Sequence, residues 1–344
     1  MCSRPARRVE AVVLLPLFLL LTAATFIYLA CESFVNGVEW VGHKLHVSQT
    51  ATATVLAALG TALPESVVTL VAVAFGDDPA HKDIGIGAAL GGPLALSTLA
   101  YAVIGWSLVA NRRRNGRATS LAQVDGRRLS RDQSWFLGIF AVKIALGALA
   151  FTVKPWLGIL FLAAYAVYIG REMRDPGTGD VEGTREPLKF RPRDGEPTLT
   201  WALLQTCVAL VVIFVASQMF VGQIDDLAPA IGLPPQLTAL LLSPIATELP
   251  ETMNALIWVR QGRERMALAN ISGAMMIQAT VPTAFGLFFT PWMLDSTLFL
   301  AAAITALAVV SLIFAFRSGL VTGEKLARVG WLYGLFAGAL VLMR

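Results

Sequence analysis

The apolar residues of this chain are gathered into long stretches, and most charged residues lie between them. Many stretches run for about 20 residues, the length that an α-helix needs to cross a bilayer. Only 15% of the 344 residues are charged and 56% are hydrophobic, whereas about a quarter of a soluble domain is charged. The sequence therefore predicts an all-α membrane protein. Its net charge of +4 is interpreted as membrane topology rather than nucleic-acid binding.

Ten stretches are apolar and long enough to be read as transmembrane helices. The first follows a cluster of arginines, as in a signal peptide, but it is longer than the apolar part of most signal peptides. No small-residue cleavage site follows it convincingly, so we expect it to be the first membrane helix. The predicted spans are 10–31, 50–75, 84–109, 134–151, 155–170, 200–222, 235–259, 267–290, 294–316 and 328–343.

Residues 171–199 divide the chain into two halves. This segment is rich in Pro, Gly and mixed charge and has no apolar periodicity, which predicts a flexible linker. Five predicted spans fall in 1–170 and five in 200–344. Most Lys and Arg residues outside the spans lie in the linker and in the other loops that follow odd-numbered spans. The positive-inside rule then places these loops in the cytoplasm and both termini outside it, in a plasma or inner membrane.

The two halves contain an internal repeat. With an offset of 186 residues, the segment GTALPES at 60–66 aligns with ATELPET at 246–252. Because each half has five spans, the second copy must enter the membrane in the opposite sense. Inverted repeats of this kind are typical of secondary transporters, whose substrate sites lie near the midplane where the two copies meet. We therefore predict two inverted five-helix repeats.

Each copy of the repeat places a carboxylate inside an apolar span, at Glu65 and at Glu251. A charge at the centre of a membrane helix costs about 2.5–3.5 kcal/mol, so it persists only with a partner or a function. Thr61 and Thr247 lie four residues earlier, on the same helix face as the glutamates. Carboxylates and hydroxyls together form an all-oxygen environment, which suits a hard cation such as Ca²⁺ or Na⁺. Proline-kinked helices that merely pack are the alternative.

These segments resemble the sodium/calcium exchanger family of the cation/Ca²⁺ antiporter superfamily over nearly the whole chain. The family signature G-[TS]-[ST]-x-P-E stands here as GTALPE and as ATELPE, and a second signature, G-N-x-x-G-S-N, is partly kept at 87–93 and 269–275. The resemblance implies that helices 2 and 7 supply Glu65 and Glu251, with threonines lining the same sites. It also implies that helices 3 and 8 complete the ion site. The candidate metal ligands are Thr61, Glu65, Thr247, Glu248, Glu251, Asn270 and Gln278.

The chain departs from the family pattern at several ligand positions. The hydroxyl residue after each threonine is replaced, by Ala62 in one copy and by Glu248 in the other. The serine of the second signature is Gly92 or Ala274, and four residues on stand Leu96 and Gln278. Crowded carboxylates in a low dielectric cannot all ionise without cations. We therefore expect the site to bind a divalent cation when deprotonated and to exchange it for protons. Pairing of Glu248 with a protein cation such as Lys143 is the alternative; Lys143 by itself is expected to be structural or to snorkel.

The resemblance implies a secondary active antiporter that exchanges a divalent cation, Ca²⁺ above all, for Na⁺ or H⁺ by alternating access. A passive cation channel and a degenerate, non-transporting exchanger are the alternatives. No phosphate-binding loop, nucleophile elbow or H-E-x-x-H motif is present, so we expect neither an enzyme nor an ATP-driven pump. The expected partners are inorganic cations and bilayer lipid; no cofactor, nucleic acid or protein partner is inferred.

Overall fold

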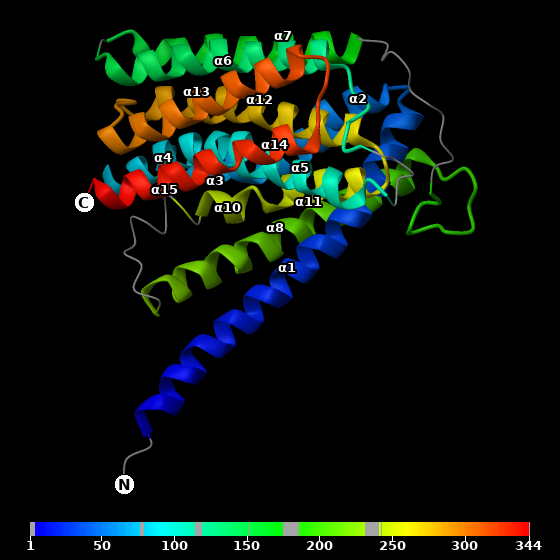
Figure 1. Cartoon of the computed structure of the whole chain (residues 1–344), viewed down its shortest axis with the longest axis horizontal. Coiled ribbons are helices and arrows are strands. Elements are labelled where there is room, and N and C mark those ends of the chain that lie inside the picture. The colour runs from blue at the N-terminus through cyan, green and yellow to red at the C-terminus, as the bar shows by residue number, and fades with distance from the viewer. Residues whose placement is uncertain are drawn as a thin grey trace.

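The computed structural model describes residues 4–75, 79–113, 119–150, 152–174, 186–230, 241 and 243–343, and its regular structure there is helical. Most helices run side by side in stacked layers (Figure 1). The first half contains α1 (Arg4–Lys44), α2 (Gln49–Ala51), α3 (Ala58–Phe75), α4 (Pro79–Ala95), α5 (Tyr101–Asn111), α6 (Gly126–Ala148) and α7 (Gly158–Arg174). The second contains α8 (Leu199–Ala230), α10 (Ser243–Thr247), α11 (Leu249–Arg260), α12 (Glu264–Phe289), α13 (Ser296–Arg317), α14 (Gly323–Val329) and α15 (Trp331–Leu342). Two π-helical turns, Thr52–Ala57 and Leu96–Ala100, join α2 to α3 and α4 to α5.

Within the described residues, seven helical segments are long and apolar enough to cross a membrane. This confirms the prediction of a helical membrane protein. The segments are Leu15–Lys44, Gly85–Asn111, Lys154–Arg174, Leu199–Phe220, Glu264–Phe289, Ser296–Arg317 and Gly323–Leu342. The other three predicted spans fall on the helical run 49–75, on α6, and on α10 with α11. The count of ten spans and the inverted repeat therefore stay predictions.

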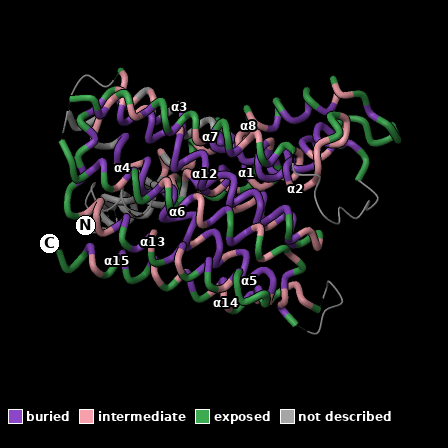
Figure 2. The backbone as a smooth tube through the Cα atoms, turned by 90° about the horizontal axis from the view of Figure 1, so that it is seen from above, coloured by how far each residue is buried: buried purple, intermediate pink, exposed green. Residues whose placement is uncertain are grey.

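Helix α12 forms the centre of the bundle. In its most apolar window 83% of the residues are buried, against 72% for α4–α5 and only 28% for α7 and for α14–α15. Figure 2 shows buried residues concentrated along the inner helices and exposed ones along the outer helices. Small residues allow this central packing. At Gly273 an added Cβ would overlap the main-chain oxygen of Thr54 and would lie 2.8 Å from its carbonyl carbon.

Helices α1 and α8 pack along each other, and the N-terminal half of α1 extends away from the body (Figure 1). The sequence predicts that the first span ends at residue 31, but the helix continues to Lys44. The reason is tertiary, because polar residues in the extension find partners. Asn36 Nδ2 donates to the main-chain oxygen of Pro187 at 3.2 Å, and Trp40 Nε1 donates to that of Glu186 at 3.0 Å.

The same contacts hold part of the predicted linker. Residues 186–198 lie against α1, and the side chain of Leu188 is fully buried in a small apolar cluster with Trp40. The main-chain N–H of Lys189 donates to Asn36 Oδ1 at 3.1 Å. This described part of the segment is thus anchored to α1 at several residues, while the flexibility of the linker as a whole stays a prediction. Residues 175–185 lie outside the described part of the chain.

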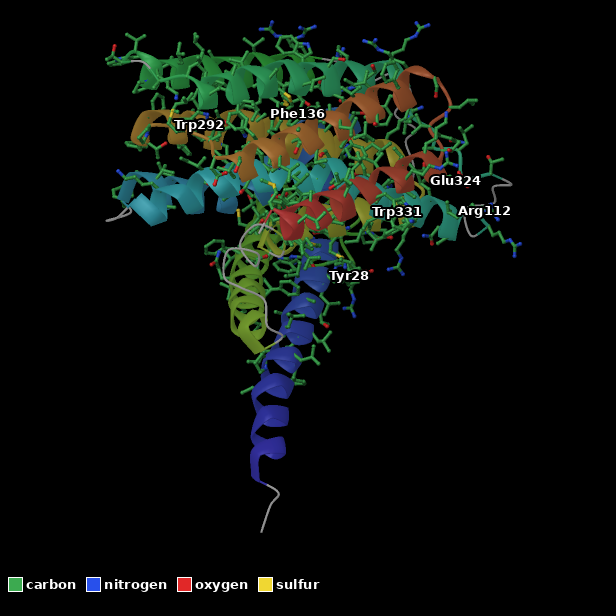
Figure 3. All side chains as sticks on the ribbon, turned by 60° about the vertical axis from the view of Figure 1, so that its left-hand side comes forward. Tyr28, Arg112, Phe136, Trp292, Glu324 and Trp331 are labelled. Atoms are coloured by element: carbon green, nitrogen blue, oxygen red, sulfur yellow. The ribbon has the colours of Figure 1, made fainter. Side chains whose placement is uncertain are left out.

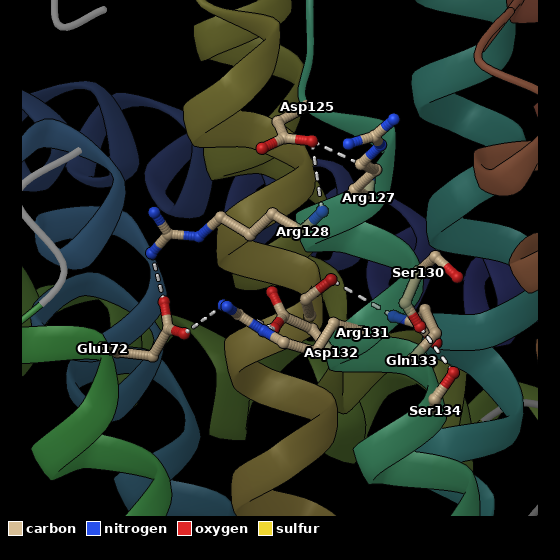
Figure 4. A network of polar contacts seen from close by, with 10 residues as sticks. Asp125, Arg127, Arg128, Ser130, Arg131, Asp132, Gln133, Ser134 and Glu172 are labelled. Carbon is tan, nitrogen blue, oxygen red and sulfur yellow. Dashed lines mark hydrogen bonds and ion pairs between the residues drawn. The ribbon is translucent and has the colours of Figure 1, made fainter. Parts of the chain in front are cut away.

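Helix α6 begins eight residues before its predicted span because it is capped and paired there. The Asp125 side chain accepts from the main-chain N–H groups of Arg127 and Arg128, a typical N-cap arrangement. Glu172 of α7, almost fully buried, forms ion pairs with Arg128 and, at 3.2 Å, with Arg131 (Figure 4). Because removing one partner of a buried ion pair leaves an uncompensated charge, this network fixes α6 against α7.

Asp132 lies at the same end of α6, before the predicted span 134–151, and is only 4% exposed. Burial, followed by repulsion from Glu172, raises the pKa of Asp132 from 3.8 to about 7, against the opposing effect of Arg131 and Arg128. The raised pKa means that the protonated form is favoured by folding. This contribution to stability is complete below about pH 4 and is lost as the pH rises through 7.

Asp132→Asn is therefore expected to flatten the pH dependence of stability. The wild-type melting temperature in detergent should fall between pH 5 and pH 8 by about 2–4 °C for each kcal/mol lost. The variant should lose less over the same interval, because an amide does not ionise. Melting curves at pH 5, 6, 7 and 8 measure this difference. Parallel pH profiles of the two proteins would show that Asp132 is already ionised at pH 5.

Candidate functional site

The predicted seventh span is interrupted at Glu248. Helix α10 ends at Thr247 and α11 begins at Leu249, with Glu248 between them at φ −88° and ψ 5°. Pro250 stands in the first turn of α11, where a missing N–H is tolerated, whereas inside a continuous helix it would break the ladder. In its described part the predicted span 235–259 is thus two helices that meet at Glu248, next to the Leu249–Pro250 pair. Broken helices of this kind surround the ion sites of many transporters.

The first copy of the motif lies in α3. The main chain there is helical through residues 63–65. The side chains of these three residues lie outside the described part of the chain, so the role of Glu65 stays a sequence prediction.

Glu248 meets α4 and α12. The side chains of Glu248 and Gln278 are each 2% exposed, and Gln278 Nε2 donates to Glu248 Oε1 at 2.5 Å. Gly92 of α4 faces this pair. A Cβ at position 92 would lie 2.6 Å from Gln278 Oε1 and 2.7 Å from Glu248 Oε1. The loss of a side chain at this position of the second signature therefore makes room for the added carboxylate and the amide.

Glu251 lies one turn further along α11, 1% exposed. Its main-chain oxygen accepts from Asn270 Nδ2 at 3.3 Å, which connects α11 to α12. Asn270 is fully buried, and its amide oxygen has no hydrogen-bond partner among the described residues. The same is true of both amide atoms of Asn254, three residues after Glu251 and also fully buried. A buried amide oxygen without a partner is costly, and a bound cation would satisfy it.

The two threonines direct their hydroxyls to their own helices. Thr61 Oγ1 donates to the main-chain oxygen of Ala57 at 3.2 Å, and Thr247 Oγ1 to that of Pro244 at 3.4 Å. A hydroxyl that donates its proton in this way keeps its oxygen lone pairs for an acceptor role. The arrangement is compatible with cation binding, and the role of both threonines stays a prediction.

Lys143 is the protein cation that the sequence suggests as a partner for Glu248. It lies in α6 and is fully buried. Its Nζ donates to the main-chain oxygen of Ala89 at 2.6 Å and to that of Gln278 at 3.4 Å. The side chain therefore points into the bundle and does not snorkel to the surface. It contacts the main chain of the residue whose side chain binds Glu248.

Sequence reasoning missed Asn254 and the contact of Gly92 with Glu248 and Gln278. An available signal for Asn254 was its spacing of three residues from Glu251, which puts both on one face of an otherwise mostly apolar helix. Nothing in the sequence indicates that Gly92 faces Glu248, because their contact joins two segments far apart in the chain. Within the described residues no three His, Cys, Asp or Glu side chains gather into one site; Glu65 lies outside that set.

Gly92→Ala tests the contact between α4 and the Glu248–Gln278 pair. The added methyl would displace the ends of two flexible side chains, so folding should be retained while the site is distorted. We expect the apparent KM for the transported cation to rise roughly tenfold, which corresponds to about 1.4 kcal/mol. Cation-concentration dependence of flux measures this effect.

The matched control for this prediction is Gly87→Ala, on the same helix. A Cβ at Gly87 would have no atom within 4 Å. An unchanged KM in Gly92→Ala would mean that the Glu248–Gln278 pair does not bind the cation.

A separate pocket of about 750 Å³ opens between α6 and α13. It is lined by Arg127, Ser130, Arg131, Ser134, Trp135, Gly138, Ile139 and Arg317. Three guanidinium groups give this pocket a positive potential, which repels cations. This pocket is therefore not a candidate for the cation site.

Comparisons with known proteins identify the family and the fold. The model of the family described as "Sodium/calcium exchanger protein" matches residues 15–172 and 201–342. The chain is 29% identical over 264 residues to the inner membrane protein YrbG of Escherichia coli strain K12, covering 75% of this chain and 74% of that protein. It is 26% identical over 277 residues to the putative antiporter CaxA of Alkalimonas amylolytica, covering 78% of each chain.

The fold is also that of a solved exchanger. The sodium-calcium exchanger NCX_Mj, in a crystal soaked with 10 mM Na⁺ and no Ca²⁺, superposes with a TM-score of 0.72. The match covers 94% of this chain and 98% of the other at 19% sequence identity. At this identity the likeness shows the shared fold, and the chemistry of the present site must be argued from its own residues.

Proposed function

The chain belongs to the sodium/calcium exchanger protein family, and from this membership we propose that it is a secondary active antiporter exchanging Ca²⁺ for H⁺ or Na⁺. The observation that carries the proposal is the pair of carboxylates at the break between α10 and α11. Glu248 and Glu251 are 2% and 1% exposed. Such groups, with amide and hydroxyl oxygens nearby, are ligands of the kind that Ca²⁺ takes.

The ten-helix architecture is part of the proposal. The helical run 49–75, α6, and α10 with α11 would each cross the membrane in addition to the seven apolar segments. Two inverted repeats, 1–170 and 200–344, would then place the GTALPE and ATELPE segments at a common midplane site. The distribution of Lys and Arg supports termini outside the cytoplasm and loops such as 110–133 inside it.

Protons are the favoured counter-ion for this chain. Glu248 stands where the family signature has a hydroxyl residue, and Ala62, Gly92 and Ala274 remove further hydroxyls. Hydroxyl oxygens can bind Na⁺ but do not exchange protons in the physiological range, whereas carboxylates bind either protons or Ca²⁺. Replacement of hydroxyls by a carboxylate therefore favours proton-coupled exchange. Na⁺ is the second candidate because the family description includes it.

Uptake of labelled Ca²⁺ into proteoliposomes tests this function. Vesicles containing the purified protein are given an outward H⁺ gradient, an outward Na⁺ gradient, or neither, at a clamped membrane potential. We expect uptake driven by the H⁺ gradient and only weak stimulation by Na⁺. Na⁺-driven uptake that does not change with pH would exclude the proton mechanism. Ca²⁺ conductance without a counter-ion would indicate a channel, and Ca²⁺ binding without flux a degenerate exchanger.

A further inference from the structure

Lys143 lies at the middle of a predicted span. It is nine residues inside the segment 134–151, which corresponds to about 14 Å along a helix. The side chain is completely buried, and its Nζ lies 5.4 Å and 6.0 Å from the ring centres of Phe140 and Trp292. A lysine at this depth is expected to have a functional partner or an ion-path role.

Two prolines explain which oxygens Lys143 binds. The Nζ donates to the main-chain oxygens of Ala89 and Gln278, and the residues four positions later are Pro93 and Pro282. A proline has no N–H, so it cannot give the usual helical hydrogen bond to the carbonyl four residues before it. The lysine therefore ends between two carbonyls from which prolines have removed the ordinary donor. One belongs to α4 and the other to α12, in the two halves of the chain.

Main-chain carbonyls inside a membrane are typical ligands of transported monovalent cations. An ammonium group carries the same single positive charge and donates to the same oxygens. The position of the Lys143 Nζ is thus that of a monovalent cation bound between α4 and α12, with the cation supplied by the protein.

This position is coupled to the carboxylate site through one residue. The main-chain oxygen of Gln278 accepts from Lys143, while its side-chain amide donates to Glu248 Oε1. The main chain of Lys143 is also fixed, because Trp292 Nε1 donates to the main-chain oxygen of Lys143 at 3.1 Å. In Figure 3, Trp292 lies on the yellow-to-orange ribbon of the second half, beneath the green helices α6 and α7. A positive charge fixed so close to the site repels the cations that the carboxylates attract.

We propose that the Lys143 ammonium is a resident counter-ion of the carboxylate site, which occupies the place of a monovalent cation between α4 and α12 and weakens cation binding so that transported ions can leave. The inference rests on the proposed cation site at Glu248 and Glu251. Lys143 acts through these groups and is a positioning and affinity-determining residue. No covalent bond forms or breaks.

The test is Ca²⁺ binding to the purified protein in detergent, by calorimetry, for wild type, Lys143→Met and Lys143→Gln. Removal of the positive charge is expected to lower the Kd for Ca²⁺ tenfold or more in both variants. In proteoliposomes both the KM and the kcat for Ca²⁺ should fall, because ions bind more tightly and leave more slowly. A merely structural lysine predicts the opposite or no change, since damage to the site weakens binding. An unchanged or raised Kd in folded variants overturns the proposal.

Three further variants isolate the charge. Lys143→Arg keeps it and should bind Ca²⁺ within about threefold of wild type, the threefold margin being about 0.7 kcal/mol. The double variant Lys143→Met with Glu248→Gln removes one charge of each sign and should return the Kd towards the wild-type value. Lys154→Met is the matched control, because Lys154 is also a buried lysine that donates to main-chain oxygens, but to those of Leu149 and Trp292 and not to those of Ala89 and Gln278. Its Kd should not change.

A variant that does not fold and a variant that folds but does not bind Ca²⁺ lead to different conclusions. Lys143→Gln retains a donor for the two carbonyls and replaces Lys143→Met if the latter does not fold. If neither single variant folds, the double variant decides, and its failure to fold would assign Lys143 a structural role and overturn the proposal. If wild type neither binds nor exchanges Ca²⁺, the proposed function fails. The inference then still predicts that the charge-removing variants gain Ca²⁺ binding, and their failure to do so overturns it.

Discussion

Glu251→Gln is expected to abolish cation exchange, with a fall in Ca²⁺ flux of a hundredfold or more. The side chain is 1% exposed, so its charge acts in a medium of low dielectric constant and attracts a divalent cation strongly. Glutamine keeps the shape of the side chain but removes the charge. A hundredfold loss corresponds to about 2.8 kcal/mol, which is modest for a buried carboxylate–cation contact. Initial rates of labelled Ca²⁺ uptake into proteoliposomes measure it.

Glu264→Gln is the control for this prediction. Glu264 is equally buried, at 2% exposure, but it lies in the first turn of α12 and not at the broken helix. Its replacement should affect stability more than flux. The repeat further predicts that Glu65→Gln behaves like Glu251→Gln. Wild-type flux in both Glu65→Gln and Glu251→Gln would refute the proposed ion site.

Gly273→Ala is expected to cause the largest loss of stability. A Cβ at this position would overlap the main-chain oxygen of Thr54 and would lie 3.0 Å from Ala58 Cβ. Because the first of these neighbours is main chain, α12 and the π-helical turn before α3 would have to separate. Overpacking of a core typically costs about 1–3 kcal/mol and more where the backbone must move. We expect the melting temperature in detergent to fall by about 5 °C or more, with reduced flux.

Gly138→Ala provides the comparison for Gly273→Ala. Gly138 lies inside α6, and a Cβ there would have no atom within 4 Å. Alanine is better than glycine inside a helix by about 1 kcal/mol, so this variant should be unchanged or slightly more stable. Equal melting temperatures for the two variants would show that α12 does not approach the main chain of Thr54 closely.

The helices were predictable from hydropathy because a helix is the local way to satisfy main-chain hydrogen bonds in an apolar medium. Their ends were less predictable, because they depend on partners that are distant in sequence. Helix α1 continues past residue 31 because Asn36 and Trp40 bind the segment 186–187. Helix α6 begins early because Asp125 caps it and Arg128 pairs with Glu172.

Part of the candidate site was also predictable from single segments. A carboxylate after a proline in an apolar span is a local pattern, and its recurrence after 186 residues identified Glu65 and Glu251 together. Pro250 is compatible with the break at Glu248 because it stands in the first turn of α11. The matching segment of α3 stays helical through residues 63–65, so the local motif does not by itself decide the break. By contrast, the amide of Gln278 on Glu248, and the space that Gly92 leaves for both, join three separate helices.

The sequence alone thus determined the membrane environment of this protein, its helical class and the presence of a carboxylate within an apolar segment of each half. These properties depend on residues close together in the chain, whose hydrophobicity and backbone chemistry act locally. Only the tertiary structure decided what surrounds the carboxylates. The position of Lys143 between two proline-freed carbonyls arises because α4 and α6 both pack against α12, which brings Ala89 and Gln278 within reach of its Nζ. No local pattern contains that information, because Coulomb forces and close packing depend on distance in space and not on distance along the chain.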